Sequence, residues 1–127
     1  MASRTIKLTN IKEGTFLSWF ATTQADFNTT MVLKDSKKTY FDKTRKDTNI
    51  EPPMAQGSGY YTGKDLEVTI NVPKAKDEDF KTFINTFTLL DPSGKEVGYS
   101  FTVCGEDYTD NDYNDFYLNV MAWKSKG

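Results

Sequence analysis

The sequence predicts an all-β protein, an antiparallel β-sandwich built as one domain over residues 1–127. Several segments alternate apolar and polar residues with a period of two, which is typical of strands with one buried face. Turn-forming residues separate these segments at short intervals, as they do in sandwiches. The chain has 127 residues, a length that suits a single hydrophobic core. Together these three observations favour the sandwich.

Six segments are predicted to be strands, in chain order Thr5–Thr9, Phe16–Thr22, Thr29–Lys34, Leu66–Val72, Tyr99–Val103 and Phe116–Ala122. The first three are rich in the threonine, aromatic and β-branched residues that strands prefer. The last three show the apolar alternation most plainly. Asp91–Gly94 carries proline at its second position and predicts a turn that joins two antiparallel strands.

Two regions have weaker patterns. Asp42–Lys64 holds two prolines and three glycines and is expected to be mostly loop, with room for one short strand. Asp77–Phe87 suits a helix, because Phe80, Phe83 and Phe87 recur at helical spacing, but its Thr and β-branched content also suits a strand. The strand is favoured because the neighbouring segments are all β.

The composition restricts the chemistry of any site. The chain contains no histidine and a single cysteine, Cys104. This removes histidine-based catalytic triads, the commonest transition-metal ligand, an internal disulfide and a thiol cluster for zinc. An enzyme would have to use carboxylates, Lys, Tyr or Cys104, and a non-enzymatic function is expected.

The sequence also restricts partners and localisation. No run of about 18 apolar residues is present, so no membrane insertion is expected. The N-terminus lacks the apolar stretch of a secretory signal, so synthesis in the cytoplasm is expected, with release or surface display only by a non-classical route. The basic stretch Lys34–Lys46 is interpreted as the solvated face of a hairpin, and no nucleic-acid partner is predicted.

Negative charge is concentrated near the C-terminus. The segment Glu96–Trp123 carries −6 and no Lys or Arg, while the rest of the chain carries +4. Within it, the ten residues Glu106–Asp115 contain five carboxylates and two carboxamides. Calcium takes six to eight oxygen ligands, whereas zinc and copper favour nitrogen and sulfur. The acidic stretch therefore predicts a calcium site.

An ordinary solvated acidic turn is the simplest alternative. Against it, Asp110, Asp112 and Asn114 occupy alternate positions, and predicted strands hold the stretch at both ends. An EF-hand does not fit either. With Asp110 at position 1 of such a loop, the required Gly is Asp115 and the required Glu is Met121.

The stretch Glu106–Asp115 resembles the calcium motif of the LecB-like bacterial lectins, which bind fucose and mannose through two calcium ions. The family motif reads E-D-G-T-D-N-D-Y-N-D, and this chain differs from it only at Tyr108. Phe20-Ala21-Thr22 parallels a family F-A-N sequence, and Gly57–Val72 parallels a family loop and strand. The resemblance implies a nine-stranded Greek-key sandwich and a homodimer or tetramer.

The resemblance also implies a role for each matched position. Residues of the first calcium site would be Glu106, Asp110, Asp112 and Asp115. The second calcium would be held by Asp112, Asn114, Asp115, the carbonyl of Thr22 and the terminal carboxylate of Gly127 of the partner subunit. The sugar-contacting residues would be Thr22, Thr23, Gln24, Ala25, Asp107, Tyr108 and Thr109, with Thr23–Ala25 as the loop that tunes sugar preference.

Three departures from the family bear on these expectations. Thr22 stands where the family has Asn, and Tyr108 stands where it has Gly. A tyrosine at this position could stack on a sugar or cover the loop. The chain between Asp115 and Trp123 is one residue longer than in the family, and the tail Lys124–Gly127 is longer too. This leaves the second calcium and the family's mode of dimerisation open.

Two rival functions stay open at this point. Calcium could stiffen a structural or adhesion sandwich that binds no sugar, in which case the metal would have no open coordination position. A glycosidase would need a protonated acid set apart from its nucleophile or base, whereas these carboxylates are closely clustered. The sequence favours a calcium-dependent lectin that chelates hydroxyls of fucose- or mannose-type glycans.

Overall fold

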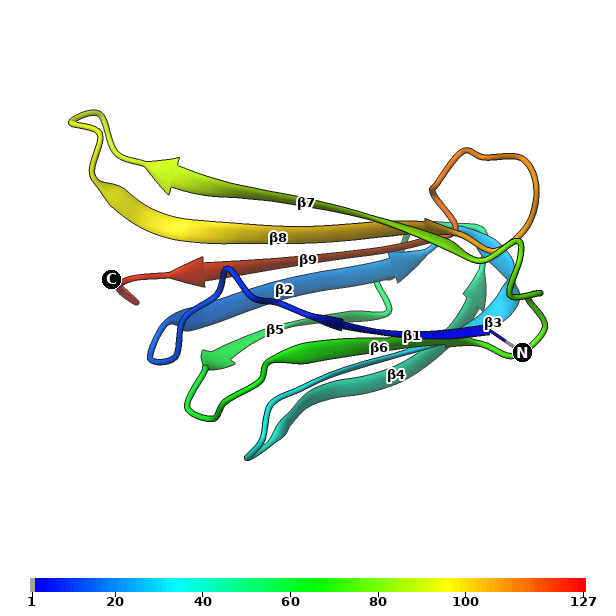
Figure 1. Cartoon of the computed structure of the whole chain (residues 1–127), viewed down its shortest axis with the longest axis horizontal. Coiled ribbons are helices and arrows are strands. Elements are labelled where there is room, and N and C mark those ends of the chain that lie inside the picture. Colours follow the sequence, from blue (N-terminus) through cyan, green and yellow to red (C-terminus); the bar gives the residue numbers. More distant parts are fainter. Residues whose placement is uncertain (1) are drawn as a thin grey trace.

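Two antiparallel sheets form the molecule in a computed structural model that describes residues 2–127 (Figure 1). The first sheet has the spatial order β1 (Ala2–Lys7), β6 (Glu67–Val72), β3 (Ala25–Lys34) and β4 (Thr39–Asp47). The second has the order β5 (Ala55–Tyr60), β2 (Phe16–Thr23), β9 (Phe116–Trp123), β8 (Glu96–Glu106) and β7 (Lys81–Leu90). The predicted all-β sandwich is confirmed.

The strand order shows how the sheets are connected. β6 lies between β1 and β3, and β9 lies between β2 and β8, so neighbours in space are often distant in sequence. Strands that follow one another along the chain, such as β4 and β5, often belong to different sheets. This is the pattern of Greek-key connections. In the part of the chain that the structure describes, no helix could span a lipid bilayer.

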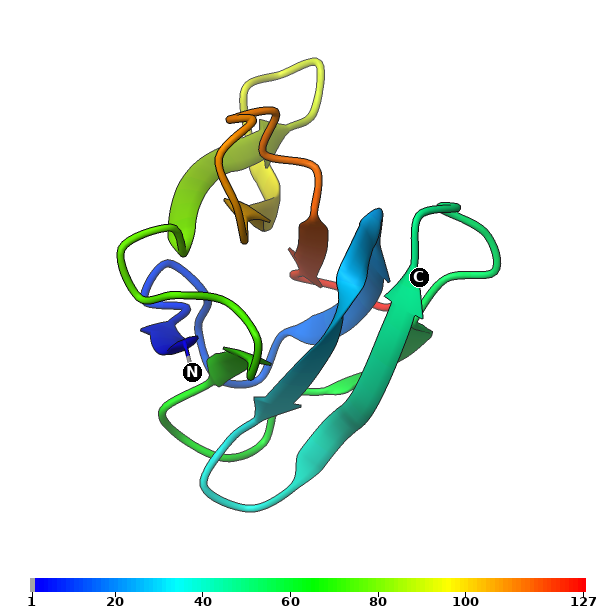
Figure 2. The same cartoon turned by 90° about the vertical axis from the view of Figure 1, so that its right-hand side faces the viewer.

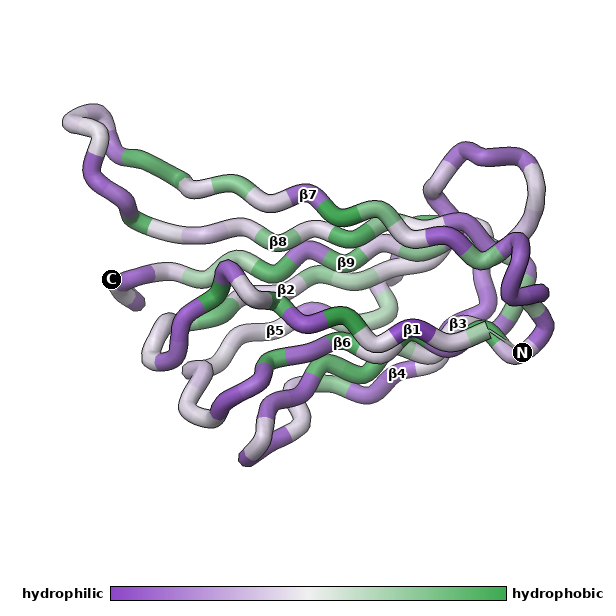
Figure 3. The backbone as a smooth tube through the Cα atoms, viewed as in Figure 1, coloured by the Kyte–Doolittle hydropathy of each residue, from purple (hydrophilic) through white to green (hydrophobic). Residues whose placement is uncertain are grey.

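The core fills the space between the sheets. The inward residues are those of the predicted alternations, and those with no exposed surface include Val68, Ile70, Val72, Val103, Leu118, Val120 and Ala122. Figure 3 shows hydrophobic and hydrophilic residues alternating along the strands. Burial of these side chains stabilises the folded chain by about 25 cal/mol for each Å² of apolar surface removed from water. The packed core therefore fixes the positions of the strands that carry the loops.

The prediction for Asp42–Lys64 was wrong in part. β4 continues to Asp47 and β5 occupies Ala55–Tyr60, so the region holds more strand than expected. Gly57, one of the glycines that suggested a loop, has a packing role, because a Cβ on it would lie 2.9 Å from the Trp19 ring. β5 can therefore pair with β2 only if small residues face Trp19.

The region Asp77–Phe87 forms a strand from Lys81 onward, as favoured, and its phenylalanines separate into two groups. Phe80 is buried and stacks on Phe116, with ring centroids 5.4 Å apart. Phe83 and Phe87 are 58% and 57% exposed on β7. The Asp91–Gly94 turn joins β7 to β8, with the Asp91 N–H donating to the Lys95 carbonyl at 2.9 Å.

Smaller differences concern strand ends. β1 begins at Ala2 and ends at Lys7, earlier than predicted, and β3 begins at Ala25 and not at Thr29. The register of β3 against β4 shifts between Ala25 and Thr29. That irregular segment lies at the end of the molecule that Figure 2 faces, where the loop between β8 and β9 also lies.

Candidate functional site

The acidic stretch forms the loop that joins β8 to β9. It begins at the last residue of β8, Glu106, and returns to the sheet at Phe116. The N–H of Asp115 donates to the carbonyl of Gly105 at 3.0 Å, which closes the base of the loop. Gly105 must be glycine, because an added Cβ would lie 1.8 Å from the Phe116 ring. The loop is thus anchored on the core, as its flanking strands predicted.

Four carboxylates converge within this loop. Glu106, Asp110, Asp112 and Asp115 each offer an oxygen, and these oxygens lie within 4.8 Å of one another. Glu106 and Asp115 are buried, whereas Asp110 and Asp112 are exposed. Among the described residues, none of the four pairs with a Lys or Arg. The structure therefore brings together the four side chains that the resemblance assigns to the first calcium.

The protonation of the cluster reflects its crowding. Burial, with hydrogen bonds to Asp110 and Asp115, raises the pKa of Glu106 to about 8. Burial also raises the pKa of Asp115 to about 6, while the hydrogen bond with Glu106 lowers the pKa of Asp110. The metal-free cluster therefore holds protons at pH values where isolated carboxylic acids have lost them.

One oxygen of the cluster receives no hydrogen bond from an N–H or hydroxyl donor among the described residues. Glu106 Oε2 accepts a hydrogen bond from the Asn111 N–H at 3.1 Å, but Oε1 is buried with no hydrogen-bond donor among the described residues. A buried carboxylate oxygen without a donor is costly. An oxygen-preferring cation at the centre of the cluster would satisfy it, so the residues present fit calcium.

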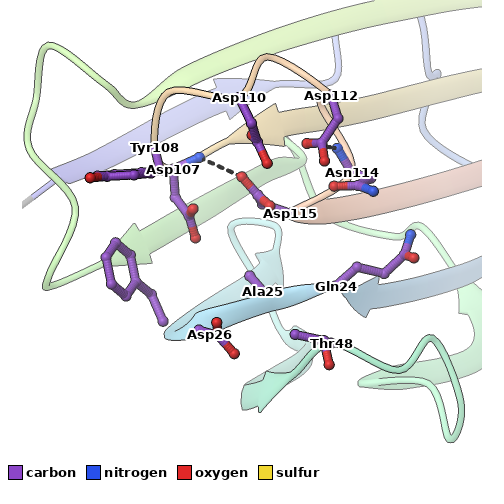
Figure 4. Close-up of a pocket in the computed structure, with 11 residues that line it drawn as sticks. Gln24, Ala25, Asp26, Thr48, Asp107, Tyr108, Asp110, Asp112, Asn114 and Asp115 are labelled. Carbon is purple, nitrogen blue, oxygen red and sulfur yellow. Dashed lines mark hydrogen bonds between the residues drawn. The ribbon is translucent and has the colours of Figure 1, made fainter.

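The cluster faces a pocket of about 650 Å³, which Figure 4 shows. The pocket is lined by Gln24, Ala25, Asp26, Phe27, Thr48, Asp107, Tyr108, Asp110, Asp112, Asn114 and Asp115. Six of these come from the acidic loop and four from the corner between β2 and β3. The N–H of Gln24 donates to the Asp115 carbonyl at 3.1 Å and holds these two segments together.

Several predicted sugar contacts lie in this pocket and others do not. Gln24, Ala25, Asp107 and Tyr108 line it, and Asn114 does so beside Asp112. Of the expected sugar contacts, Thr22, Thr23 and Thr109 do not line it, and of the expected metal ligands, Glu106 and Gly127 do not. Thr109 is exposed on the loop, where its carbonyl accepts a hydrogen bond from the Asn111 side chain at 3.4 Å.

The expected tuning loop Thr23–Ala25 is shorter than predicted. β2 extends through Thr23 and β3 begins at Ala25, so only Gln24 lies between the strands. Thr23 is fully buried, and its hydroxyl donates to the Asp47 carbonyl at 3.2 Å. Its side chain therefore holds the end of β4 against β2.

Thr22 is also committed to a structural contact through its hydroxyl. Thr22 Oγ1 donates to the Ile50 carbonyl at 2.7 Å and accepts a hydrogen bond from Arg45 at 2.7 Å. The resemblance assigns the backbone carbonyl of Thr22 to the second calcium, and these side-chain hydrogen bonds do not bear on that expectation. They do engage the hydroxyl that the expected sugar contact of Thr22 would use. Gly127 lies at the opposite end of the molecule from the acidic loop in Figure 1.

Arg45 is a residue whose role the sequence did not indicate. Its guanidinium donates to the Thr22 hydroxyl and to the Thr23 carbonyl at 2.7 and 2.8 Å, and it also reaches the Asn49 carbonyl. The side chain is only 10% exposed. The interpretation of Lys34–Lys46 as a solvated hairpin face was therefore wrong for Arg45, which ties β2 to the segment that carries Thr48.

Asp26, Phe27 and Thr48 line the pocket and were not predicted to do so. The only sequence signal for Asp26 and Phe27 was their position directly after Gln24 and Ala25. Thr48 carried no signal, because its place in the pocket depends on the tertiary contact that Arg45 makes.

No protein-family model and no curated protein sequence matches the chain. Three similar solved structures are a Ralstonia solanacearum high-affinity mannose-binding lectin, a Chromobacterium violaceum lectin in complex with α-methyl-fucoside, and the C-terminal domain of a Burkholderia cenocepacia lectin. The Ralstonia lectin has a TM-score of 0.68 and 17% sequence identity, and the superposed part covers 92% of this chain and 93% of the lectin chain.

The other two have TM-scores of 0.64 and 0.63 at 12% and 13% identity. The superposition with the Chromobacterium lectin covers 92% of this chain and 93% of the lectin chain. The superposition with the Burkholderia domain covers 94% of this chain and 97% of that domain. This chain has the fold of these bacterial lectins. The resemblance seen in the acidic motif is confirmed at the level of the fold.

Proposed function

We propose that this chain is a non-enzymatic, calcium-dependent lectin that binds fucose- or mannose-type sugars by chelating their hydroxyls. The observation that carries the proposal is the four-carboxylate cluster, with its unpartnered Glu106 oxygen, at the wall of an open pocket. The lectin fold of the structural neighbours supports it.

The residues divide between two proposed ions. Glu106, Asp110, Asp112 and Asp115 would hold the first, and they supply only oxygen ligands. Asp112, Asn114 and Asp115 would contribute to the second, together with the Thr22 carbonyl and Gly127 of the partner subunit. Calcium bound there would supply coordination positions at which sugar hydroxyls replace water.

The exposure of the cluster separates this function from its nearest rival. A structural calcium site is closed by protein ligands, whereas Asp110 and Asp112 are exposed and face the pocket. The pocket therefore leaves room for a ligand on the metal side. This observation favours sugar binding over a calcium-stiffened adhesion module.

Self-association is part of the proposal, and two surfaces could provide it. The C-terminal strand β9 lies inside its sheet between β2 and β8, so only its tail and its outer face are available to a partner. β7 is an edge strand that exposes Phe83, Ile84, Phe87 and Leu90. Edge strands usually carry charges that prevent pairing, but β7 has none after Lys81.

The test is a titration by isothermal calorimetry. Methyl α-fucoside and methyl α-mannoside are titrated into the protein in calcium chloride and, separately, after chelation with EDTA. We expect at least one sugar to bind in calcium and neither to bind after chelation. Binding that is equal in both buffers would contradict the calcium-dependent site.

A further inference from the structure

The pocket continues past the carboxylate cluster to a side that the proposed calcium ions do not use. This side of the pocket, called the far compartment below, is lined by Asp26 and Phe27 at the start of β3 and by Tyr108 on the acidic loop, and Figure 4 shows Tyr108 and Asp26 on the side away from Asn114. Its walls come from two different segments, so it exists only in the folded protein. The whole pocket, at about 650 Å³, has the size of a site for a ligand larger than one pyranose ring.

Asp107 lies between the cluster and this compartment, and its carboxyl group can accept hydrogen bonds from a ligand in the pocket. The residue is 6% exposed, and its Oδ2 is buried with no hydrogen-bond donor among the described residues. Figure 4 shows its carboxyl group pointing from the loop toward the side of the pocket where Asp26 lies. Because Asp107 lines the pocket, a hydroxyl group of a bound ligand would donate to the part of the carboxyl group that is accessible there.

The two aromatic residues give the compartment an apolar surface. Tyr108 is 60% exposed although it is large, and Phe27 is half-buried against the core. Carbohydrate rings present C–H groups on their faces, and an aromatic ring can cover such a face while carboxylates accept hydrogen bonds from the ring's hydroxyls. The combination of Tyr108 and Asp26 suits a sugar.

Charge narrows the ligand class. Two calcium ions would balance the four carboxylates of the cluster, whereas Asp26 and Asp107 would remain uncompensated. A ligand in the far compartment is therefore expected to carry no negative charge.

We propose that Asp26, Phe27 and Tyr108 form a subsite for the second residue of a neutral oligosaccharide whose first residue lies on the metal cluster. This inference rests on the proposed function and deepens it: the ligand is a glycan of two or more residues. Tyr108 stacks on the second residue, Asp26 accepts its hydroxyls, and Asp107 contacts the junction between the two residues.

Calorimetry in calcium chloride tests the subsite. Methyl α-mannoside is compared with the α-1,2-, α-1,3- and α-1,6-linked mannobioses on the wild type, Tyr108→Ala, Asp26→Ala and the control Tyr60→Ala. Tyr60 is also exposed but lies on β5, outside the pocket. We expect at least one mannobiose to bind the wild type about tenfold more tightly than methyl α-mannoside.

The variants are expected to change the ratio of the two affinities. Tyr108→Ala and Asp26→Ala should each reduce the preference for the disaccharide, and Tyr60→Ala should retain it. Equal affinity of the wild type for all mannobioses and methyl α-mannoside would overturn the subsite and leave the proposed function standing. So would equal weakening of both ligand types by Tyr108→Ala. Failure of methyl α-mannoside, methyl α-fucoside and every mannobiose to bind in calcium would overturn the proposed function and the subsite with it. Binding of methyl α-fucoside without binding of any mannoside would overturn the subsite and leave the proposed function standing.

Discussion

The N–H of Asp107 donates to Oδ2 of Asp115 at 2.9 Å, and this bond joins the two ends of the acidic loop. Asp115 also donates its own N–H to Gly105, and its carbonyl accepts from Gln24. One residue therefore connects the loop, the sheet and the β2–β3 corner. Because Asp115 also belongs to the carboxylate cluster, binding of a metal there would stiffen the acidic loop and the corner between β2 and β3 together.

Calcium should stabilise the fold. Metal that binds only the folded chain, at about one hundred times its Kd, adds about 2.7 kcal/mol for each site, which corresponds to about 10 °C in Tm for a chain of this size. Thermal denaturation in calcium chloride, magnesium chloride and EDTA measures the effect. We expect the large increase only in calcium, because magnesium requires a smaller and more regular site. The same Tm in all three buffers would contradict a calcium site.

The metal-free protein should lose stability as the pH rises. The pKa values of Glu106 and Asp115, about 8 and about 6 in the folded chain, lie above their ordinary values of 4.5 and 3.8. The folded chain therefore binds more protons than the unfolded chain between about pH 4 and pH 8, and the free energy of unfolding falls across that interval.

Urea denaturation in calcium-free buffer at about pH 5 and pH 8 measures this trend. Glu106→Gln is the matched variant, because an amide of similar size cannot titrate, and its stability should depend less on pH. Added calcium should reverse the trend, since protons compete with the metal for the same oxygens. A calcium-free wild type that is more stable at pH 8 than at pH 5 would contradict the pKa directions.

The strands and the acidic cluster were predictable because their signals are local. The alternation at Phe116–Ala122 reports one buried face directly, and the spacing of Asp110, Asp112 and Asp115 keeps their side chains within one short loop. β5 was expected only as one short strand without defined ends, because Gly57 is selected by contact with Trp19, a residue distant in sequence. Local glycine content alone indicates a turn there.

The rest of the pocket could not be read from the sequence for the same reason. Arg45 lies in a run of cations that suggests a solvated face, and its hydrogen-bond acceptors come from Thr22, Thr23 and Asn49 only after β2 and β4 approach each other. Thr48 enters the pocket through this contact. Tertiary contacts of this kind leave no periodic signal in the chain.

Arg45→Met should destabilise the protein and disturb the pocket. The substitution keeps the length of the side chain but leaves the Thr23 carbonyl, and the other acceptors near it, without a charged donor. We expect a loss of about 1–3 kcal/mol in the free energy of unfolding, measured by urea denaturation. Lys46→Met is the control, because Lys46 is the neighbouring cation and is exposed. Equal stabilities of the two variants would show that the Arg45 contacts contribute nothing.

The oligomeric state should reveal which surface is used. Light scattering is expected to show a homodimer or tetramer, and two variants separate the possibilities. Deletion of Lys126 and Gly127 removes the tail, whereas Phe83→Lys combined with Phe87→Lys places charges on the exposed β7 edge. The variant that yields monomers identifies the interface. If the deletion also weakens sugar binding, the tail completes a calcium site of the neighbouring subunit. A wild type that is monomeric at all concentrations would contradict the proposed assembly.

Asp112→Ala should abolish sugar binding while the sandwich stays folded. Asp112 is exposed, so its removal creates no cavity in the core, yet its carboxylate belongs to the cluster and is assigned to both proposed ions. Its loss should therefore damage two coordination shells at once.

Gln24→Ala should instead change the ratio of affinities for methyl α-fucoside and methyl α-mannoside, because Gln24 lines the pocket without offering a carboxylate to the metal. Asp42→Ala, an exposed carboxylate on β4, is the control for the loss of one negative charge. Calorimetry in calcium chloride on the three variants decides the assignment. Sugar binding that survives Asp112→Ala with wild-type affinity would place the ligand away from the carboxylate cluster.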